Sequence, residues 1–284
     1  MNLKPALLLA FLALTACSDD DKVIFTSGGS GTPPPPAVET GPFKLLLYTR
    51  TGGFRHTSIP FAIDAIRGLG AENDFSVDAT EDPNAFTDDN LKQYQVIVFA
   101  NTTGEILDDA QQAAMERFVA GGGGFVGVHS AADTEYEWPF YGRLIGAYFR
   151  NHPVQQLGVF VNEAPDHPAT AHLPARWLIF DEFYSYRSNP RPDVRVLLSI
   201  DESTYLQDPN TSHLPTPEGE FQEGETGTMG DHPMSWCHDN LGGRAWYTEL
   251  GHSEYLYLLP DYRQHLLQGI LTAARRVAAD CAPR

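Results

Sequence analysis

The sequence is poor in cysteine, in basic residues and in long apolar runs. It has three cysteines among 284 residues, and 19 basic side chains stand against 37 acidic ones, for a formal net charge of −18. Binding to nucleic acid needs a basic face that displaces counterions, so this balance argues against a nucleic-acid partner. After residue 16 no apolar run approaches the ~18 residues of a membrane-spanning helix. We therefore look for a membrane anchor only at the N-terminus.

The N-terminus has the pattern of an exported lipoprotein. Residues 6–16, ALLLAFLALTA, have the length of a signal-peptide core and are too short to span a membrane. The stretch ends in Leu-Thr-Ala-Cys, which resembles the bacterial lipobox, so we predict a signal peptide at 1–16 and lipidation of Cys17. An ordinary signal peptide with an incidental cysteine is the alternative. Ser18 follows the cysteine, and by resemblance to the bacterial sorting rule this favours the outer membrane, at its periplasmic or cell-surface face.

Residues 17–42 are interpreted as the lipidated cysteine and a tether. Gly and Ser at 27–31 give flexibility, and four prolines at 33–36 form a stiff extended spacer. Residues 43–280 suit one large globular domain. Its two cysteines, Cys237 and Cys281, can pair in an oxidising compartment, or Cys237 can stay free and buried.

Short apolar runs alternate with helical patterns in the N-terminal half of the domain. Strands that are apolar throughout and alternate with helices indicate a parallel sheet covered on both faces. The predicted fold class is therefore α/β, with a doubly wound, flavodoxin-like sheet. The expected strands are 44–48, 75–79, 95–100, 125–128, 159–162, 195–200 and 244–250. Helices are expected from Thr57 or Ser58, from Asp108 to Gly121 and at 262–279, with a long loop at 202–230.

Polar residues follow several of these strands. Ligands bind outside the carboxyl ends of the strands of an open parallel sheet, so we expect these side chains to line one pocket. The fourth strand meets its turn as in the elbow that presents a nucleophile in α/β hydrolases, here without the G-x-S-x-G pattern. The residues concerned are Arg50, Arg55 and His56 after the first strand, Asn101, Thr102 and Glu105 after the third, His129, Ser130 and Asp133 after the fourth, and His252 after the last.

Three histidines precede a proline, which pushes the residue before it out of the helical region. They are His152, His167 and His232. We interpret the first two as hydrogen-bonded loop histidines. His232 is favoured as a functional residue because Asp231 precedes it and Trp236, a flat face for stacking a sugar ring, follows.

A pair of carboxylates, Asp181 and Glu182, precedes an aromatic pair. On a strand the two point to opposite faces, and we expect Glu182 to enter the pocket, where a carboxylate suits acid–base work. Histidines and carboxylates also suit Zn²⁺ or Mn²⁺. Since the sequence has no HExxH, CxxC pair or EF-hand loop, a metal would need ligands from distant loops. The candidate ligands are His56, His129, His232 and His252.

Several separated motifs resemble the ThuA-like, trehalose-utilisation family. They are RTGGFRHTSI (50–59), GGGGFVGVHSAADT (121–134), the segment from Trp138 to His152 with Gly146 and Phe149, DEFY (181–184), MGDHPMSW (229–236) and GRAWYTELGH (243–252). The resemblance implies a class I glutamine amidotransferase-like fold, a three-layer sandwich with a mostly parallel sheet. It also implies a link to disaccharide and glycoside catabolism beside oxidoreductases that make 3-keto sugars, and a pocket lined by His56, His129, Glu182, Asp231, His232 and His252. Because His129 takes the position of the nucleophilic cysteine, glutamine hydrolysis through a thioester is not expected.

These observations predict an enzyme that acts on a glycoside or keto-sugar by acid–base chemistry, in which either Arg55 or a divalent metal stabilises an oxyanion or enediolate. The catalytic residues are expected to be His129, His232, Glu182 and Asp231, and the substrate-binding residues Arg55, His56, Asp133, Trp236 and His252. One alternative is a carbohydrate-binding surface lipoprotein without turnover, which stacks sugars on Trp138, Trp236 and Tyr247. Another is a hydrolase that uses Ser130 or Cys237.

Overall fold

The structure, a computed structural model, describes residues 38–207 and 227–284. The chain divides into two units, Met1–Pro34 and Pro35–Arg284. The predicted signal peptide at 1–16, the lipidation of Cys17 and most of the predicted tether at 17–42 lie outside the described residues, as do residues 208–226 of the predicted loop.

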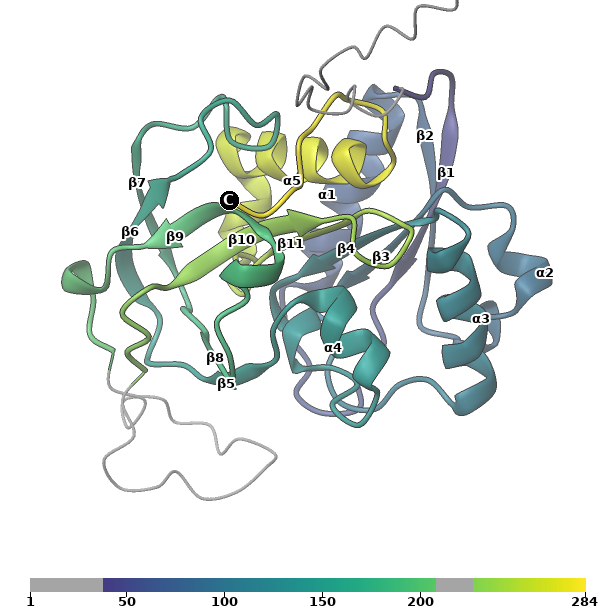
Figure 1. Cartoon of the computed structure of the whole chain (residues 1–284), viewed down its shortest axis with the longest axis horizontal. Helices are drawn as coiled ribbons and strands as arrows, with labels where there is room; N and C mark the ends of the chain where they lie inside the picture. Colours follow the sequence, from purple (N-terminus) through teal and green to yellow (C-terminus); the bar gives the residue numbers. More distant parts are fainter. Residues whose placement is uncertain (1–37, 208–226) are drawn as a thin grey trace, which may run out of the picture. The chain divides into compact units, whose positions relative to one another are not determined.

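A nine-stranded sheet in the order β2-β1-β3-β4-β11-β10-β9-β6-β7 organises the second unit (Figure 1). Its first five strands pair in parallel, and all residues of β3, β4 and β11 are buried because helices cover both faces there. The predicted α/β fold with a large, mostly parallel sheet is confirmed. The five strands are β1 (Phe43–Tyr48), β2 (Phe75–Thr80), β3 (Val96–Ala100), β4 (Gly124–Val128) and β11 (Ala245–Thr248).

Antiparallel pairs extend the sheet beyond β11. The sequence analysis did not predict two of these strands, β7 and β10. β7 alternates buried and exposed residues, and β10 begins at Pro233, which is tolerated because it is the first residue of a strand. The four strands are β6 (Gln156–Asn162), β7 (Arg176–Asp181), β9 (Arg195–Ile200) and β10 (Pro233–His238); a separate small sheet pairs β5 (Phe149–Asn151) with β8 (Ser185–Tyr186).

Strand direction decides which loops share an edge of the sheet. The pairings make β10 and β6 run against the other seven strands. The carboxyl ends of seven strands therefore lie at the same edge as the amino ends of β10 and β6. Loops from both halves of the domain reach this edge.

Helices cover both faces of the parallel strands (Figure 1). α1 and α5 lie side by side over one face, and α3 and α4 lie over the other. Asp108 begins α3 with a capping box, as expected, whereas the closing helix ends at Ala273 rather than at residue 279. The helices are α1 (Ile59–Glu72), α2 (Asp88–Leu91), α3 (Asp109–Ala120), α4 (Pro139–Ile145) and α5 (Pro260–Ala273).

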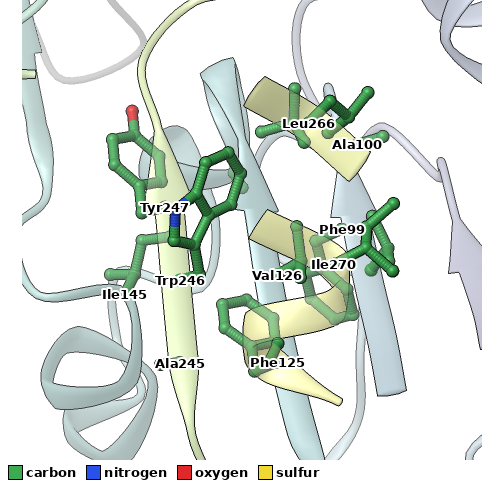
Figure 2. Packing of buried hydrophobic residues seen from close by; sticks show 14 of the residues in the cluster. Phe99, Ala100, Phe125, Val126, Ile145, Ala245, Trp246, Tyr247, Leu266 and Ile270 are labelled. Carbon is green, nitrogen blue, oxygen red and sulfur yellow. The ribbon is translucent and has the colours of Figure 1, made fainter. Parts of the chain in front are cut away.

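The core on either face of β11 follows from the alternation of strand side chains. Trp246 points towards α5, and its neighbour Tyr247 points to the opposite face, towards Ile145 at the end of α4 (Figure 2). A Cβ at Gly269 of α5 would lie 2.5 Å from the Trp246 ring. Glycine at this position therefore lets α5 approach the sheet closely.

A disulfide ties the chain after α5 to the sheet. Cys237 of β10 and Cys281 are bonded, with their Cα atoms 5.2 Å apart. Of the two alternatives left open by the sequence, the structure has the pair and not the free Cys237. Among the described helices none combines the length and the apolar character needed to cross a membrane.

Candidate functional site

Four side chains from distant loops meet at the shared edge of the sheet. One imidazole nitrogen from each histidine and one carboxylate oxygen lie within 4.8 Å of one another. Each follows a strand: one comes after β1, one directly after β4, one directly after β7 and one after β11. The positions after β1, β4 and β11 were expected, whereas β7 was not predicted. We call them the histidine cluster; its members are His56, His129, Glu182 and His252.

His129 is the most constrained member of the cluster. It has a positive φ of 51° directly after β4, a strained conformation like that of the residue presented at a nucleophile elbow. Its Nδ1 lies 2.8 Å from the carbonyl oxygen of Glu249, and its Nε2 lies 3.0 Å from the Tyr184 hydroxyl and 3.5 Å from Glu182 Oε2. The ring is fully buried, so its orientation is fixed by these contacts.

Glu182 is the centre of the cluster. Its Oε2 lies 3.1 Å from His252 Nδ1, and its Oε1 lies 3.0 Å from Nδ1 of a further histidine, His152. Burial alone would raise the pKa of this carboxyl, but hydrogen bonds to His129 and His252 hold the pKa well below its ordinary value. The side chain is therefore an ionised carboxylate among imidazoles.

The pKa values of the other buried groups at the site are shifted in opposite directions. Burial lowers the pKa of His129, but hydrogen bonds to Glu182 and Glu249 outweigh it and raise this pKa. Burial raises the pKa of Glu249 to about 8, although His129 opposes the rise. Burial and the nearby His129 and His252 hold the pKa of His56 well below its ordinary value. One cationic and one neutral imidazole thus face the same carboxylate.

The loop that carries His252 is held by Asp181. This buried carboxylate accepts hydrogen bonds from the backbone N–H groups of Gly251, His252 and Ser253, at 2.9, 3.3 and 2.8 Å. As predicted from the strand, Asp181 and Glu182 point apart: one anchors the loop and the other enters the cluster. His252 Nε2 reaches the side chain of Gln155, at 2.6 Å.

His152 and Tyr184 also contact the histidine cluster, although neither was predicted to do so from the sequence. His152 was interpreted as an ordinary loop histidine, yet it contacts Glu182, and Tyr184 contacts His129. The position of His152 in the chain explains its place at the site. It precedes β6, which runs antiparallel to its neighbours, so it lies at the same edge of the sheet as the residues that follow β4 and β7.

The structure does not bring His232 and Asp231 into the cluster. His232 Nε2 bonds to the backbone carbonyl of Tyr184 at 2.8 Å and Nδ1 contacts Glu202 at 3.0 Å, so both ring nitrogens are engaged in holding the loop. Asp231 lies at the surface and pairs with Arg191. Neither geometry fits the predicted catalytic role.

The tryptophans and tyrosine expected to stack sugars belong to the core. The Trp236 indole donates to the carbonyl of Ile145, and its ring packs at a tilt against Tyr247 with the ring centroids 4.4 Å apart; both residues are 1% exposed. Trp138 is also buried. An exposed aromatic beside the cluster is Phe54, which is 45% exposed and lies edge-to-face with His56 at 4.8 Å.

Two other expected substrate-binding residues are engaged outside the cluster. Arg55 pairs with Glu81 at 2.7 Å, with its side chain 53% exposed. Asp133 accepts a hydrogen bond from the Tyr136 hydroxyl at 2.6 Å. The loop after β1 therefore delivers to the cluster not Arg55 but the residue that follows it, His56.

The two nucleophile candidates have other partners. Ser130 Oγ lies 3.3 Å from His56 Nδ1, in contact with a cluster histidine, and is fully buried. Cys237 is bonded to Cys281 and has no free thiol. A second group of potential ligands, His167 with these two cysteines, is unsuitable for a metal because metal binding requires thiolates.

Comparison with known proteins supports the resemblance. The family model described as ThuA, trehalose utilisation, matches residues 44–273. A ThuA-like protein from Bacteroides uniformis has 26% identity and a TM-score of 0.65, over 83% of this chain and 93% of that chain. One from Parabacteroides merdae has 20% identity and a TM-score of 0.63, over 86% and 98%. No curated protein matches this chain.

Proposed function

The chain belongs to the ThuA family, described by trehalose utilisation, and from this premise we propose that it is an enzyme acting on a glycoside or keto-sugar at the histidine cluster. The observation that carries the proposal is the convergence of His56, His129, His252 and Glu182 within 4.8 Å. Strain at His129 and a buried carboxylate are costly to folding. Such costs concentrate at sites that carry chemistry.

The proposed reaction is proton transfer to or from a sugar oxygen or the carbon beside a keto group. Glu182 is the proposed base, because it is ionised and contacts three histidines. His129 supplies positive charge that steadies a developing oxyanion. Phe54 offers an exposed face next to His56 on which a sugar ring packs.

A substrate screen with matched variants tests this proposal. Purified protein is incubated with disaccharides and their 3-keto forms, and products are identified by mass spectrometry. Removal of an acid–base group costs about 10²–10⁴-fold in rate, so Glu182→Gln should lower kcat/KM by at least about 100-fold. The matched control is His172→Ala, an exposed histidine whose Nε2 contacts the carbonyl oxygen of Asp261, which should retain wild-type kinetics. Equal activity of both variants contradicts the proposal.

The alternative of a binding protein without turnover predicts a different outcome. Its stacking residues, Trp138, Trp236 and Tyr247, are buried, which removes the observation that favoured it. Calorimetry in the same screen decides: binding of an intact glycan with no product for any member favours the binding protein over the enzyme.

We also propose that the protein is exported and lipid-anchored at Cys17, in the outer membrane. The bonded Cys237 and Cys281 support export, because disulfides persist in oxidising compartments. Expression of wild type and Cys17→Ala in a bacterial host, followed by detergent phase partition, tests the anchor. Wild type should enter the detergent phase and the variant the aqueous phase; identical partition rejects the anchor.

A further inference from the structure

We propose that the histidine cluster binds one divalent transition-metal ion, zinc or manganese, through His56, His129, His252 and Glu182. The inference concerns the site of the proposed sugar chemistry, but it rests on donor geometry and is tested without any sugar. Three of the four side chains, His56, His129 and Glu182, are at most 4% exposed. They come from three separate loops, so their convergence is a property of the fold and not of local sequence.

The spacing of the donor atoms fits a metal. Bonds of 2.0–2.2 Å from a tetrahedral ion place neighbouring ligand atoms about 3.4 Å apart. Glu182 Oε2 lies 3.5 Å from His129 Nε2 and 3.1 Å from His252 Nδ1. No two of the four ligand atoms are more than 4.8 Å apart. Side-chain rotations that move these atoms by a few tenths of an ångström to about one ångström would therefore bring all four to bonding distance from one ion.

The donor types select the class of ion. Three imidazoles and one carboxylate suit zinc and the neighbouring transition metals. Calcium and magnesium prefer sets made of oxygen atoms. Glu182 supplies the single ionised carboxylate, and a cation at this point compensates a buried negative charge.

Hydrogen bonds behind the ligands orient them as a metal site requires. His129 Nδ1 donates to the Glu249 carbonyl at 2.8 Å, so its Nε2 is the nitrogen that faces Glu182. Binding of an ion releases the proton from Nε2, and the ion then supplies the positive charge that the protonated ring supplies in its absence. His56 Nδ1 contacts Ser130 Oγ, which leaves Nε2 as the ligating nitrogen. His252 Nε2 contacts the side chain of Gln155, so its Nδ1 is the nitrogen that faces Glu182. Metal-binding histidines ordinarily have such partners on the second nitrogen.

A buried, partly unpaired carboxyl group lies behind His129. Glu249 Oε1 is 3.7 Å from His129 Nδ1, while its Oε2 has no hydrogen-bond partner among the described residues and is fully buried. A divalent ion on the far side of the His129 ring would strengthen the hydrogen bond from Nδ1 to the Glu249 backbone carbonyl. The side chain of Glu249 lies close enough to Nδ1 to add to this polarisation of the ring.

The test measures metal directly. Protein purified without chelators is analysed by elemental mass spectrometry, then stripped, dialysed and titrated calorimetrically with Zn²⁺ and with Mn²⁺. We expect one ion per chain for the wild type and for His172→Ala. In Glu182→Gln and His56→Gln we expect affinity to fall by at least about 100-fold, and in Glu249→Gln by about 10-fold.

Cobalt gives a readout that does not depend on the stability of the variants. Co²⁺ added to stripped wild-type protein should give a visible absorption band that one equivalent of Zn²⁺ abolishes. Near-ultraviolet circular dichroism confirms that each variant is folded. Failure of the wild type to bind Zn²⁺, Mn²⁺ or Co²⁺ near one equivalent overturns the proposal, as does binding that survives unchanged in both ligand variants. Because no sugar is present, failure of the sugar proposal leaves these results unaffected.

Discussion

Among single residues, Glu135 shows how this domain uses a buried carboxyl outside the histidine cluster. It has a positive φ of 54° and is fully buried. Its Oε1 accepts hydrogen bonds from the backbone of Ile106 and Leu107, both at 2.8 Å, and its Oε2 accepts one from Gln112. The carboxyl therefore pins the loop before α3 to the turn after β4. Burial raises its pKa to about 7, although these hydrogen bonds oppose the rise.

We predict that Glu135 makes the protein less stable as pH rises from about 4.5 to about 7. The folded state holds its proton up to about pH 7 and the unfolded state only up to about 4.5, so stability falls by about 1.4 kcal/mol per pH unit across this window. Glu135→Gln keeps the acceptor oxygen and removes the titration. Urea unfolding at pH 5 and pH 8 measures this. The free energy of unfolding of the variant, relative to that of the wild type, should be higher at pH 8 than at pH 5. A stability difference that is the same at both pH values would refute this.

The candidate site could be predicted from the sequence where a side chain follows a strand. His56, His129 and His252 are such residues, and parallel strands send their carboxyl ends to one edge. Glu182 was predicted instead from its pairing with Asp181 and from the family motif. The sequence did not separate them from His232, because which partners occupy its two ring nitrogens depends on Tyr184 and Glu202, far away along the chain. Contacts of this kind are absent from any local pattern.

At the scale of elements, the approach of α5 to β4 depends on a glycine. A Cβ at Gly124 would lie 2.4 Å from the backbone oxygen of Ala273, the last residue of α5. Backbone cannot move aside as a flexible side chain does, so we predict that Gly124→Ala lowers the free energy of unfolding by about 1–3 kcal/mol. Chemical denaturation at neutral pH measures this loss.

The matched control is a glycine with room around it. A Cβ at Gly68, inside α1, would meet only Arg263 Nη2, at 3.5 Å. Alanine is favoured over glycine in a helix by about 1 kcal/mol. Gly68→Ala should therefore stabilise the protein by about that amount. The packing argument fails if both alanine variants shift stability in the same direction.

Strands could be predicted where burial on both faces makes them apolar throughout, as in β3 and β4. β7 is the edge of the sheet, and Leu178 and Phe180 on its exposed face conceal the alternation by which a half-buried strand is identified. β10 was not predicted as a strand. Its pairing with β9 and β11 is a long-range feature that no local propensity encodes.

For the whole molecule, the disulfide is a constraint on the unfolded chain. Cys237 and Cys281 are 44 residues apart, so the bond closes a long loop that contains β11 and α5. We predict that Cys237→Ser with Cys281→Ser costs about 2–4 kcal/mol. Thermal unfolding with and without reductant measures this. The reduced wild type should have the same melting temperature as the double variant. An unchanged melting temperature of the wild type on reduction would contradict the prediction.

The whole molecule should also lose stability in acid through histidines buried in neutral form. Burial lowers the pKa of His265 to about 3 and that of His167 to about 4. Below pH 6.5 these histidines bind protons in the unfolded chain but stay neutral in the folded chain. Each of them therefore lowers the free energy of unfolding by about 1.4 kcal/mol per pH unit.

His265 Nδ1 donates to the carbonyl of Ala169, and Nε2 accepts from Thr248. His265→Asn retains a donor for Ala169 but cannot titrate. The variant should have a lower free energy of unfolding than the wild type, measured with urea. This difference should shrink by about 2 kcal/mol between pH 6.5 and pH 5, because only the wild type loses stability through His265. A constant deficit over that range would show that His265 accepts a proton without unfolding, and acid lability would then have to arise elsewhere in the fold.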